Sequence, residues 1–499
     1  MQRRVVLLGA ASAILQVVVN GVVLFFLYKF LYGALGVAKL GLWSLVMATT
    51  SLSNLANLGL SASVVKFVAK YMARGEEEKA SLVIQTSALS LGVFFAALSF
   101  AAFLLINWIL HLVLPAASIA DGRALVPFSL TSMWLIMVSG VFQSGMDGHQ
   151  KVYLRNYLLI AATVLNFSAC LLLVPRYGLM GVAYAQVFQS SLMLVASWVV
   201  LKKLMPVLPL VPWRWNRKLF AEMAAYGVNF QVITVSTMLY DPLTKSLLAK
   251  FGGLATTGYY EMASRLTQQV RALIISANQV LVPTIASLQE RDPDSIRKVY
   301  VDSYKLILFT SFPAFSALAA LTPVISKLWT GQYQPEYIFL AILLAAGWQL
   351  NTLAAPAYFV FAGVGILRWN TVGHVAIGLL SLGLGVLMGS FWGGLGVVAA
   401  WVVSLAVGSA IIPVAYHRRE GIPLSCLLPR SEAALFGGCA LGTVISLALF
   451  ATMKGHLGTL ALAGLVGVVL VASQGYFLWT SPTRRRLTGW VLEEFATLR

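Results

Sequence analysis

Five ionisable residues lie within one apolar stretch, residues 226–288: Asp241, Lys245, Glu261, Arg265 and Arg271. The stretch is predicted to form two long helices joined by FGGLATTGYY at 251–260. Charged side chains in a helix that crosses a membrane are costly, so they pair with one another or face a polar interior. These five residues are therefore the first candidates for function in this chain.

Helical spacing pairs four of the five charges. Asp241 and Lys245 are four residues apart, as are Glu261 and Arg265, with the acid first in both pairs, which is the favoured order. At the rise of an α-helix, Asp241 lies about 13 Å, Arg265 about 10 Å and Arg271 about 20 Å from the same, outer, surface. Arg271 is therefore the charge for which the stretch itself supplies no acid.

The residue types suit the binding of an anion. A guanidinium stays charged when buried and presents a planar fork to phosphate oxygens, so we predict substrate contacts for Arg271 and Arg265. Gln268 and Asn278 on the same helix would add uncharged hydrogen-bonding groups. The alternative for Arg271 is a structural contact with a backbone carbonyl or an acid of another span, and for Arg265 it is a local pair with Glu261.

Three further residues are candidates with structural alternatives. Asp241 is the candidate for coupling transport to H⁺ or Na⁺, because a carboxylate in a cleft can titrate or hold a cation. The favoured interpretation is nonetheless a structural ion pair with Lys245 or Arg265. Lys66 and Lys70, one turn apart at the cytoplasmic end of the second predicted helix, would bind an anionic group of a substrate. Their role as topology signals explains them equally.

The composition predicts the transmembrane helices that position these charges. Of the 499 residues, 59% are hydrophobic and 10% charged, and the mean hydropathy is +0.84. Apolar runs long enough to cross about 30 Å of hydrocarbon recur along the chain. We predict an all-α polytopic membrane protein with about 14 transmembrane helices. The predicted spans are 5–31, 40–65, 82–113, 126–147, 154–174, 179–201, 221–248, 258–286, 304–329, 337–363, 368–390, 395–417, 433–453 and 457–480.

The net charge of +18 follows from topology. Most Lys and Arg residues fall in alternate loops, which the positive-inside rule assigns to the cytoplasm together with both termini. This distribution explains the net positive charge without a nucleic-acid partner. The three cysteines have neither metal-ligand spacing nor the pattern of a disulfide framework. The chain lacks a nucleotide-binding G-x-x-x-x-G-K-[ST] loop, so we expect no nucleotide hydrolysis. It also lacks an H-E-x-x-H or paired-Cys metal motif, and we expect no catalytic residues, metal or cofactor.

An internal repeat organises the chain. YGLMGVAYA at 177–185 matches WGGLGVVAA at 392–400, and LGVAKLGLW at 35–43 matches GGLATTGYY at 252–260. Six helices in each copy give both copies the same orientation, as two bundles around a central cleft. The predicted domains are an N-terminal six-helix bundle (1–204), a proline-rich cytoplasmic linker (205–218), a C-terminal six-helix bundle (219–420), and two extra helices with a basic cytoplasmic tail (421–499).

The sequence resembles the multidrug/oligosaccharidyl-lipid/polysaccharide (MOP) flippase superfamily, on its polysaccharide biosynthesis or O-antigen flippase branch. The resemblance is carried by LGLSASVVKFVAKYMARGEEEKA at 58–80, the two G-x-x-x-x-G-[LY]-[WY] turns of the repeat, and YDPLTKSLLAKFGGLATTGYYEMASRL at 240–266. It implies a protein of the bacterial or archaeal inner membrane. Such a protein moves a polyprenyl-pyrophosphate-linked oligosaccharide to the outer leaflet by alternating access. The resemblance also implies contact with membrane lipids, and with a polysaccharide polymerase and glycosyltransferases as partners.

Other functions stay open from the sequence. Within the same fold, the alternatives are a flippase for the peptidoglycan lipid precursor and a cation-coupled multidrug exporter. An exporter of cations would be expected to have an acidic cleft, whereas the predicted cleft is neutral to basic. A membrane polysaccharide polymerase or glycosyltransferase is an alternative of another class, but the predicted outer loops are short. A scaffold without transport activity would leave the buried charges unexplained.

Overall fold

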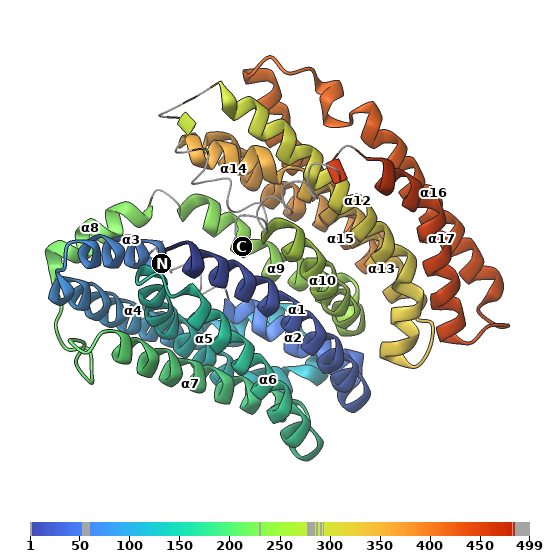
Figure 1. Cartoon of the computed structure of the whole chain (residues 1–499). Helices are drawn as coiled ribbons and strands as arrows, with labels where there is room; N and C mark the ends of the chain where they lie inside the picture. The colour runs from blue at the N-terminus through green and yellow to red at the C-terminus, as the bar shows by residue number, and fades with distance from the viewer. Residues whose placement is uncertain are drawn as a thin grey trace. The chain divides into compact units, whose positions relative to one another are not determined.

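The computed structural model describes residues 2–51, 60–228, 231–276, 285, 288–289, 292, 294–481 and 483–484. Within these residues every regular element is a helix (Figure 1). The predicted all-α fold is confirmed. The helices form because apolar residues dominate their sequences, and in a bilayer every backbone N–H and C=O must find its partner inside the segment.

The chain divides into two compact units. Unit 1 comprises Met1–Glu261 and Gly389–Gly394, and unit 2 comprises Met262–Met388 and Leu395–Arg499. Between α7, which ends at Leu204, and α8, which begins at Arg217, the backbone leaves the helical path, as the prolines of the predicted linker require. The predicted domain boundaries on either side of this linker stay a prediction.

Unit 1 is built from the first half of the chain. Its helices are α1 (Gln2–Leu35), α2 (Val37–Ser51), α3 (Leu60–Ala73), α4 (Glu77–Val113), α5 (Ile119–Gly148), α6 (Val152–Tyr177), α7 (Leu179–Leu204), α8 (Arg217–Val228), α9 (Gln231–Phe251) and the first turns of α10 (Gly253–Ser276), with a short 3₁₀ turn at Ala116–Ser118. Helix α5 packs against α4 and α7, and α6 against α1 and α7. The buried core between α3, α4, α5 and α7 includes Val68, Ile84, Phe142 and Met146.

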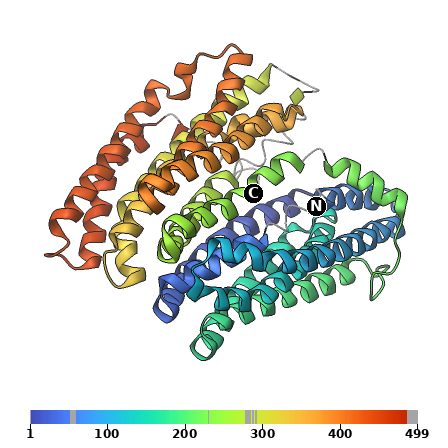
Figure 2. The same ribbon diagram turned by 180° about the vertical axis from the view of Figure 1, so that it is seen from behind.

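Unit 2 is built around α12. Its helices are the remainder of α10, α12 (Ser295–Thr330), α13 (Pro335–Leu353), α14 (Ala355–Val364), α15 (Arg368–Arg419), α16 (Arg430–Met453) and α17 (Thr459–Thr480), with a 3₁₀ turn at Leu424–Leu427. Helix α12 packs against α13, α16 and α17. The hairpin of α16 and α17 is seen from both sides in Figures 1 and 2. Ser316 of α12 joins this hairpin by a hydrogen bond with Thr443 of α16 (2.8 Å) and one from Gln474 of α17 (2.9 Å).

Ten helical stretches within the described residues are long and apolar enough to cross a membrane. They confirm a multi-pass membrane protein, and they include both helices placed after residue 430. The longest, Arg368–Arg419, contains Gly393 in a non-helical conformation (φ 61°, ψ −144°), so it consists of two helices that meet at a kink. This break lies between the spans predicted at 368–390 and 395–417. The middle of the span predicted at 40–65 lies outside the described residues.

The repeat is visible in the backbone. Gly178 (φ 55°, ψ −130°) has nearly the same conformation as Gly393, its counterpart in the match between 177–185 and 392–400. Gly36 (φ 77°) and Gly253 (φ 81°) agree in the same way in the other match. Both pairs occupy the left-handed region, where only glycine avoids a steric cost. The recurrence of these turns supports the duplication that the sequence predicts.

Two further glycines of the repeat let α2 and α10 approach closely. A Cβ atom on Gly41 would lie 1.9 Å from the carbonyl oxygen of Leu254, and one on Gly258 would lie 2.2 Å from the carbonyl oxygen of Val37. The two contacts are equivalent under the repeat, because Gly41 matches Gly258 and Val37 matches Leu254. Backbone contact of this kind requires residues without side chains. It places α1, α2, α9 and the start of α10 around the charged residues described next.

Candidate functional site

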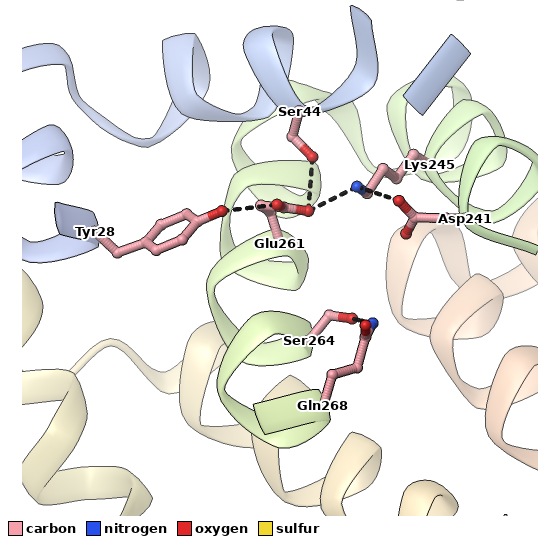
Figure 3. Close-up of polar contacts among 7 residues, drawn as sticks. All are labelled: Tyr28, Ser44, Asp241, Lys245, Glu261, Ser264 and Gln268. Carbon is pink, nitrogen blue, oxygen red and sulfur yellow. Dashed lines mark hydrogen bonds and ion pairs between the residues drawn. The ribbon is translucent and has the colours of Figure 1, made fainter. Parts of the chain in front are cut away.

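Lys245 lies between two carboxylates in unit 1. Its Nζ is 2.6 Å from Oδ2 of Asp241 and 2.7 Å from Oε2 of Glu261 (Figure 3). Asp241 precedes Lys245 by one turn of α9, as the spacing predicts. Glu261 belongs to α10 and reaches the lysine across the turn at 252, where two adjacent glycines allow the chain to reverse. The Asp241–Lys245 contact was predictable, whereas the contact with Glu261 was not.

Glu261 also accepts hydrogen bonds from α1 and α2. Tyr28 donates its hydroxyl to Oε1 (2.8 Å), and Ser44 donates its hydroxyl to Oε2 (2.8 Å; Figure 3). Both carboxylate oxygens are therefore occupied. The spacing of 217 residues that relates Ser44 to Glu261 is the offset of the repeat, and the same offset relates Tyr28 to Lys245. One copy of the repeat thus supplies hydroxyl groups where the other supplies charges.

The three charges of this network differ in exposure. The side chains of Lys245 and Glu261 are each 2% exposed, whereas that of Asp241 is 44% exposed. Two carboxylates and one ammonium leave one net negative charge. A buried charge is tolerated only when it is paired and hydrogen-bonded, and Lys245 and Glu261 meet this condition. Asp241 is the member of the network that water or a cation can reach.

Arg271 occupies a different environment, in unit 2. Its Nε donates to Oδ1 of Asn351 on α13 (3.0 Å), and its guanidinium carbon lies 4.9 Å from the centre of the Trp348 ring. Asn351 in turn donates to the hydroxyl of Ser409 on α15 (2.7 Å). Tyr358 and His374, whose rings meet edge to face at 5.8 Å, lie within electrostatic range of the guanidinium. The residues described by the structure provide no carboxylate for Arg271.

This environment positions the guanidinium without neutralising it. Stacking on an indole face and an amide hydrogen bond hold an arginine in place while preserving its charge. The acid on another span that would have made Arg271 purely structural is absent from the described part of unit 2. The Nη groups donate to none of the described residues, so they can bind an anion.

The remaining predicted residues lie outside these two clusters. Arg265 is exposed, and its predicted pair with Glu261 stays a prediction. Gln268 donates to the hydroxyl of Ser264, one turn earlier on α10 (2.8 Å; Figure 3). Lys66 and Lys70 are exposed near the end of α3, where their ammonium groups lie 5.9 and 5.6 Å from the centre of the Phe67 ring. Asn278 lies outside the described residues.

Sequence reasoning missed the neutral partners of the charges. Tyr28, Trp348 and Asn351 have no distinctive spacing relative to the charges they contact. A weak signal existed for Asn351, which is an amide three residues after a tryptophan within a predicted span. For Ser44 the signal was the repeat itself, since superposing its copies places Ser44 on Glu261.

Neither cluster has the ligands of a metal centre. No group of three or more His, Cys, Asp or Glu residues that could hold a metal ion occurs among the described residues. In the network around Lys245, Asp241 is the carboxylate that is accessible to a ligand. The cluster around Arg271 can bind a phosphate or another anion.

Comparison with known proteins gives a family and a fold. The family model described as "Polysaccharide biosynthesis protein" matches residues 34–337. The search of curated proteins gives no match. Similar solved structures include the lipid II flippase MurJ in an inward closed conformation, at 14% identity, covering 94% of this chain and 98% of that chain, with a TM-score of 0.72.

Two further structures have the same fold. An inward-facing multidrug resistance MATE family transporter of the MOP superfamily is 15% identical, with coverage of 80% of this chain and 94% of that chain and a TM-score of 0.69. A MOP superfamily transporter from Pyrococcus furiosus is 13% identical, with coverage of 84% and 96% and a TM-score of 0.61. At these identities the likeness establishes the architecture and leaves the substrate to the residues of this chain.

Proposed function

The chain belongs to the polysaccharide biosynthesis protein family of the MOP superfamily, and from this premise we propose that it is a flippase for a lipid-linked oligosaccharide. Its substrate would be an O-antigen or other surface polysaccharide unit on polyprenyl pyrophosphate. The protein would move this unit from the inner to the outer leaflet of a bacterial or archaeal plasma membrane. Both termini would lie in the cytoplasm, as the distribution of Lys and Arg predicts.

The observation that carries this proposal is the environment of Arg271. A guanidinium inside a membrane protein is costly unless its charge is used. Here it is oriented by Asn351 and Trp348, with no acid among the described residues to neutralise it. A pyrophosphate supplies the missing negative charge and matches the donor fork. The guanidinium would repel the cationic substrate of a drug exporter, so Arg271 favours an anionic substrate.

The network around Lys245 supplies a contact that alternating access would break. Tyr28 and Ser44 belong to the first six-helix repeat, whereas Lys245 and Glu261 belong to the second. Movement of one repeat against the other would separate these groups and expose Glu261. Protonation of Asp241, or Na⁺ binding there, would weaken its hold on Lys245. We therefore infer that a coupling ion acts through Asp241, and that no other cofactor is needed.

The proposal is tested by complementation in a strain that lacks its own oligosaccharide flippase. Arg271→Ala and Arg271→Lys are compared with the wild type at matched membrane abundance, with surface glycan as the readout. Arg176→Ala is the matched control, because it removes an exposed guanidinium at the end of α6. We expect Arg271→Ala to abolish surface glycan, Arg271→Lys to restore part of it, and the control to act as wild type.

Two outcomes contradict the proposal. If Arg271→Ala supports normal surface glycan, the guanidinium does not bind the substrate. If the wild-type protein fails in this strain but complements a strain that lacks a flippase for the peptidoglycan lipid precursor, the substrate is that precursor. If the Arg271→Ala protein does not accumulate in the membrane, Arg271→Gln replaces it in the comparison. Glutamine keeps a hydrogen-bond donor for Asn351 but removes the charge, so we expect this variant to be inactive.

A further inference from the structure

An apolar groove of 580 Å³ lies in unit 1 between α4, α5, α7 and the non-helical segment 205–216. Its wall includes Gly92, Ala96, Trp134 and Trp198, and the segment contributes Leu210, Val211 and Pro212. The volume lies within the range of about 300–1,000 Å³ that is typical of small-ligand sites. Nearly all of the lining groups are hydrocarbon, so the groove suits a lipid chain.

Side chains of α4 hold the segment in place. The backbone N–H groups of Trp213 and Arg214 donate to Oε1 of Gln85 (3.4 and 3.2 Å), and that of Asn216 donates to the hydroxyl of Thr86 (3.3 Å). The indole N–H of Trp215 donates to Ser90 (2.9 Å). These bonds satisfy polar backbone that would otherwise be costly near lipid. The segment therefore forms an edge of the groove that is fixed to α4 by hydrogen bonds.

The exposed side chains of the segment, including two that line the groove, have the character of a membrane interface. Leu210, Val211, Trp213 and Trp215 are 74%, 70%, 66% and 52% exposed. Tryptophan at these positions is typical of the headgroup layer, with hydrocarbon residues beside it. Exposed apolar side chains of this size, on non-helical backbone, are stable when lipid covers them.

A more polar pocket adjoins the apolar groove along the same segment. It is lined by Glu78, Lys79, Gln85, Trp213 and Arg214 and has a volume of 420 Å³. Lys79 is paired with Glu76 (3.0 Å), so Arg214 is the cation of this pocket that none of the described carboxylates pairs with. The guanidinium of Arg214 lies 4.7 Å from the centre of the Trp213 ring. Hydrocarbon on one side of the segment and the guanidinium of Arg214 on the other match the two parts of an anionic lipid.

We propose that the groove binds one acyl chain of an anionic phospholipid, whose phosphate lies against Arg214. The lipid belongs to the leaflet that faces the cytoplasm in the orientation proposed above. Bound there, it fastens the segment 205–216 to α4, α5 and α7. The site is separate from Arg271 and from the Lys245 network, and it does not depend on which substrate the protein moves.

The test is retention of lipid by the purified full-length protein in native mass spectrometry. Dioleoyl phosphatidylglycerol and dioleoyl phosphatidylethanolamine are titrated separately into delipidated protein. Gly92→Leu adds a side chain to the groove wall, where a Cβ atom would make one ordinary contact, with Val138 at 3.9 Å. Ala96→Leu fills it from the next turn of α4. Gly383→Leu is the control, because it adds the same side chain at an exposed glycine of α15 with no atom within 4 Å of its Cβ.

We expect the wild type to retain one phosphatidylglycerol at lower lipid concentration than phosphatidylethanolamine. Each groove-filling variant should weaken retention of both lipids about tenfold, a change of about 1.4 kcal/mol in binding free energy. Arg214→Gln should remove the preference for phosphatidylglycerol and leave phosphatidylethanolamine binding unchanged, and Gly383→Leu should match the wild type.

Two results would overturn this inference. The first is wild-type retention in both Gly92→Leu and Ala96→Leu. The second is displacement of phosphatidylglycerol by undecaprenyl phosphate at a lower concentration than a second phosphatidylglycerol requires, which would assign the groove to the polyprenyl tail of a substrate. Neither result would bear on Arg271, because the experiment does not measure transport.

Discussion

The substitution Lys245→Met tests whether the buried pair of Lys245 with Glu261 stabilises the protein more than the exposed pair of Lys245 with Asp241. Methionine keeps the length and apolar stem of lysine but removes the ammonium that contacts Glu261 at 2.7 Å and Asp241 at 2.6 Å. Glu261, only 2% exposed, is left as a buried carboxylate held by Tyr28 and Ser44. Removing one partner of a buried pair costs about 3–5 kcal/mol.

Asp241→Asn is the matched comparison. It removes the other acid that contacts Lys245, but the Asp241 side chain is 44% exposed, so solvent screens the interaction. Exposed pairs contribute about 0–1 kcal/mol. The two variants should therefore differ in free energy of unfolding by about 2–5 kcal/mol, with Lys245→Met the less stable.

The assay is unfolding of the purified full-length protein by sodium dodecyl sulfate, followed by circular dichroism. Lys245→Met combined with Glu261→Gln removes both buried charges and should cost less than the sum of the single substitutions, by about 0.5–3 kcal/mol. Equal stability of Lys245→Met and Asp241→Asn would refute the reasoning. So would strict additivity in the double variant, because it would mean that Lys245 and Glu261 do not interact.

Two further predictions concern stability. Gly41→Ala should destabilise the protein by about 1–3 kcal/mol, because its Cβ would lie 1.9 Å from the carbonyl oxygen of Leu254. Gly33→Ala is the control and should not destabilise the protein, because its Cβ would meet no atom within 4 Å. Equal melting temperatures of the two variants would contradict this prediction. Burial lowers the pKa of His149 below 6.5, with the charge of Glu77 opposing part of the effect. The unfolded chain then binds the proton more readily, so stability falls as the pH drops through 6.5. His149→Gln should lose less melting temperature than the wild type between about pH 8 and about pH 5, and an equal loss would contradict the assignment.

The helices could be predicted because their signal is local. A run of apolar residues gains enough transfer free energy to form a span whatever its neighbours are. The breaks in helical backbone at Gly178 and Gly393 could also be predicted, because the repeat aligns the two glycines and backbone with positive φ favours glycine. The ion pair of Asp241 with Lys245 is local too, because one helical turn fixes its geometry.

The partners across helices required the tertiary structure. Glu261 lies 217 residues from Ser44 and 233 from Tyr28 in the chain, so only packing of α1 and α2 against α10 decides that they meet. The same holds for Arg271, whose charge was evident while its contacts with Asn351 and Trp348 were not. The amino-acid sequence by itself determined the spans, the repeat and the existence of buried charges, because these follow from hydropathy and short-range spacing. Only the tertiary structure decided which charges pair with one another and which lies among neutral side chains, because that depends on contacts between residues far apart in the chain.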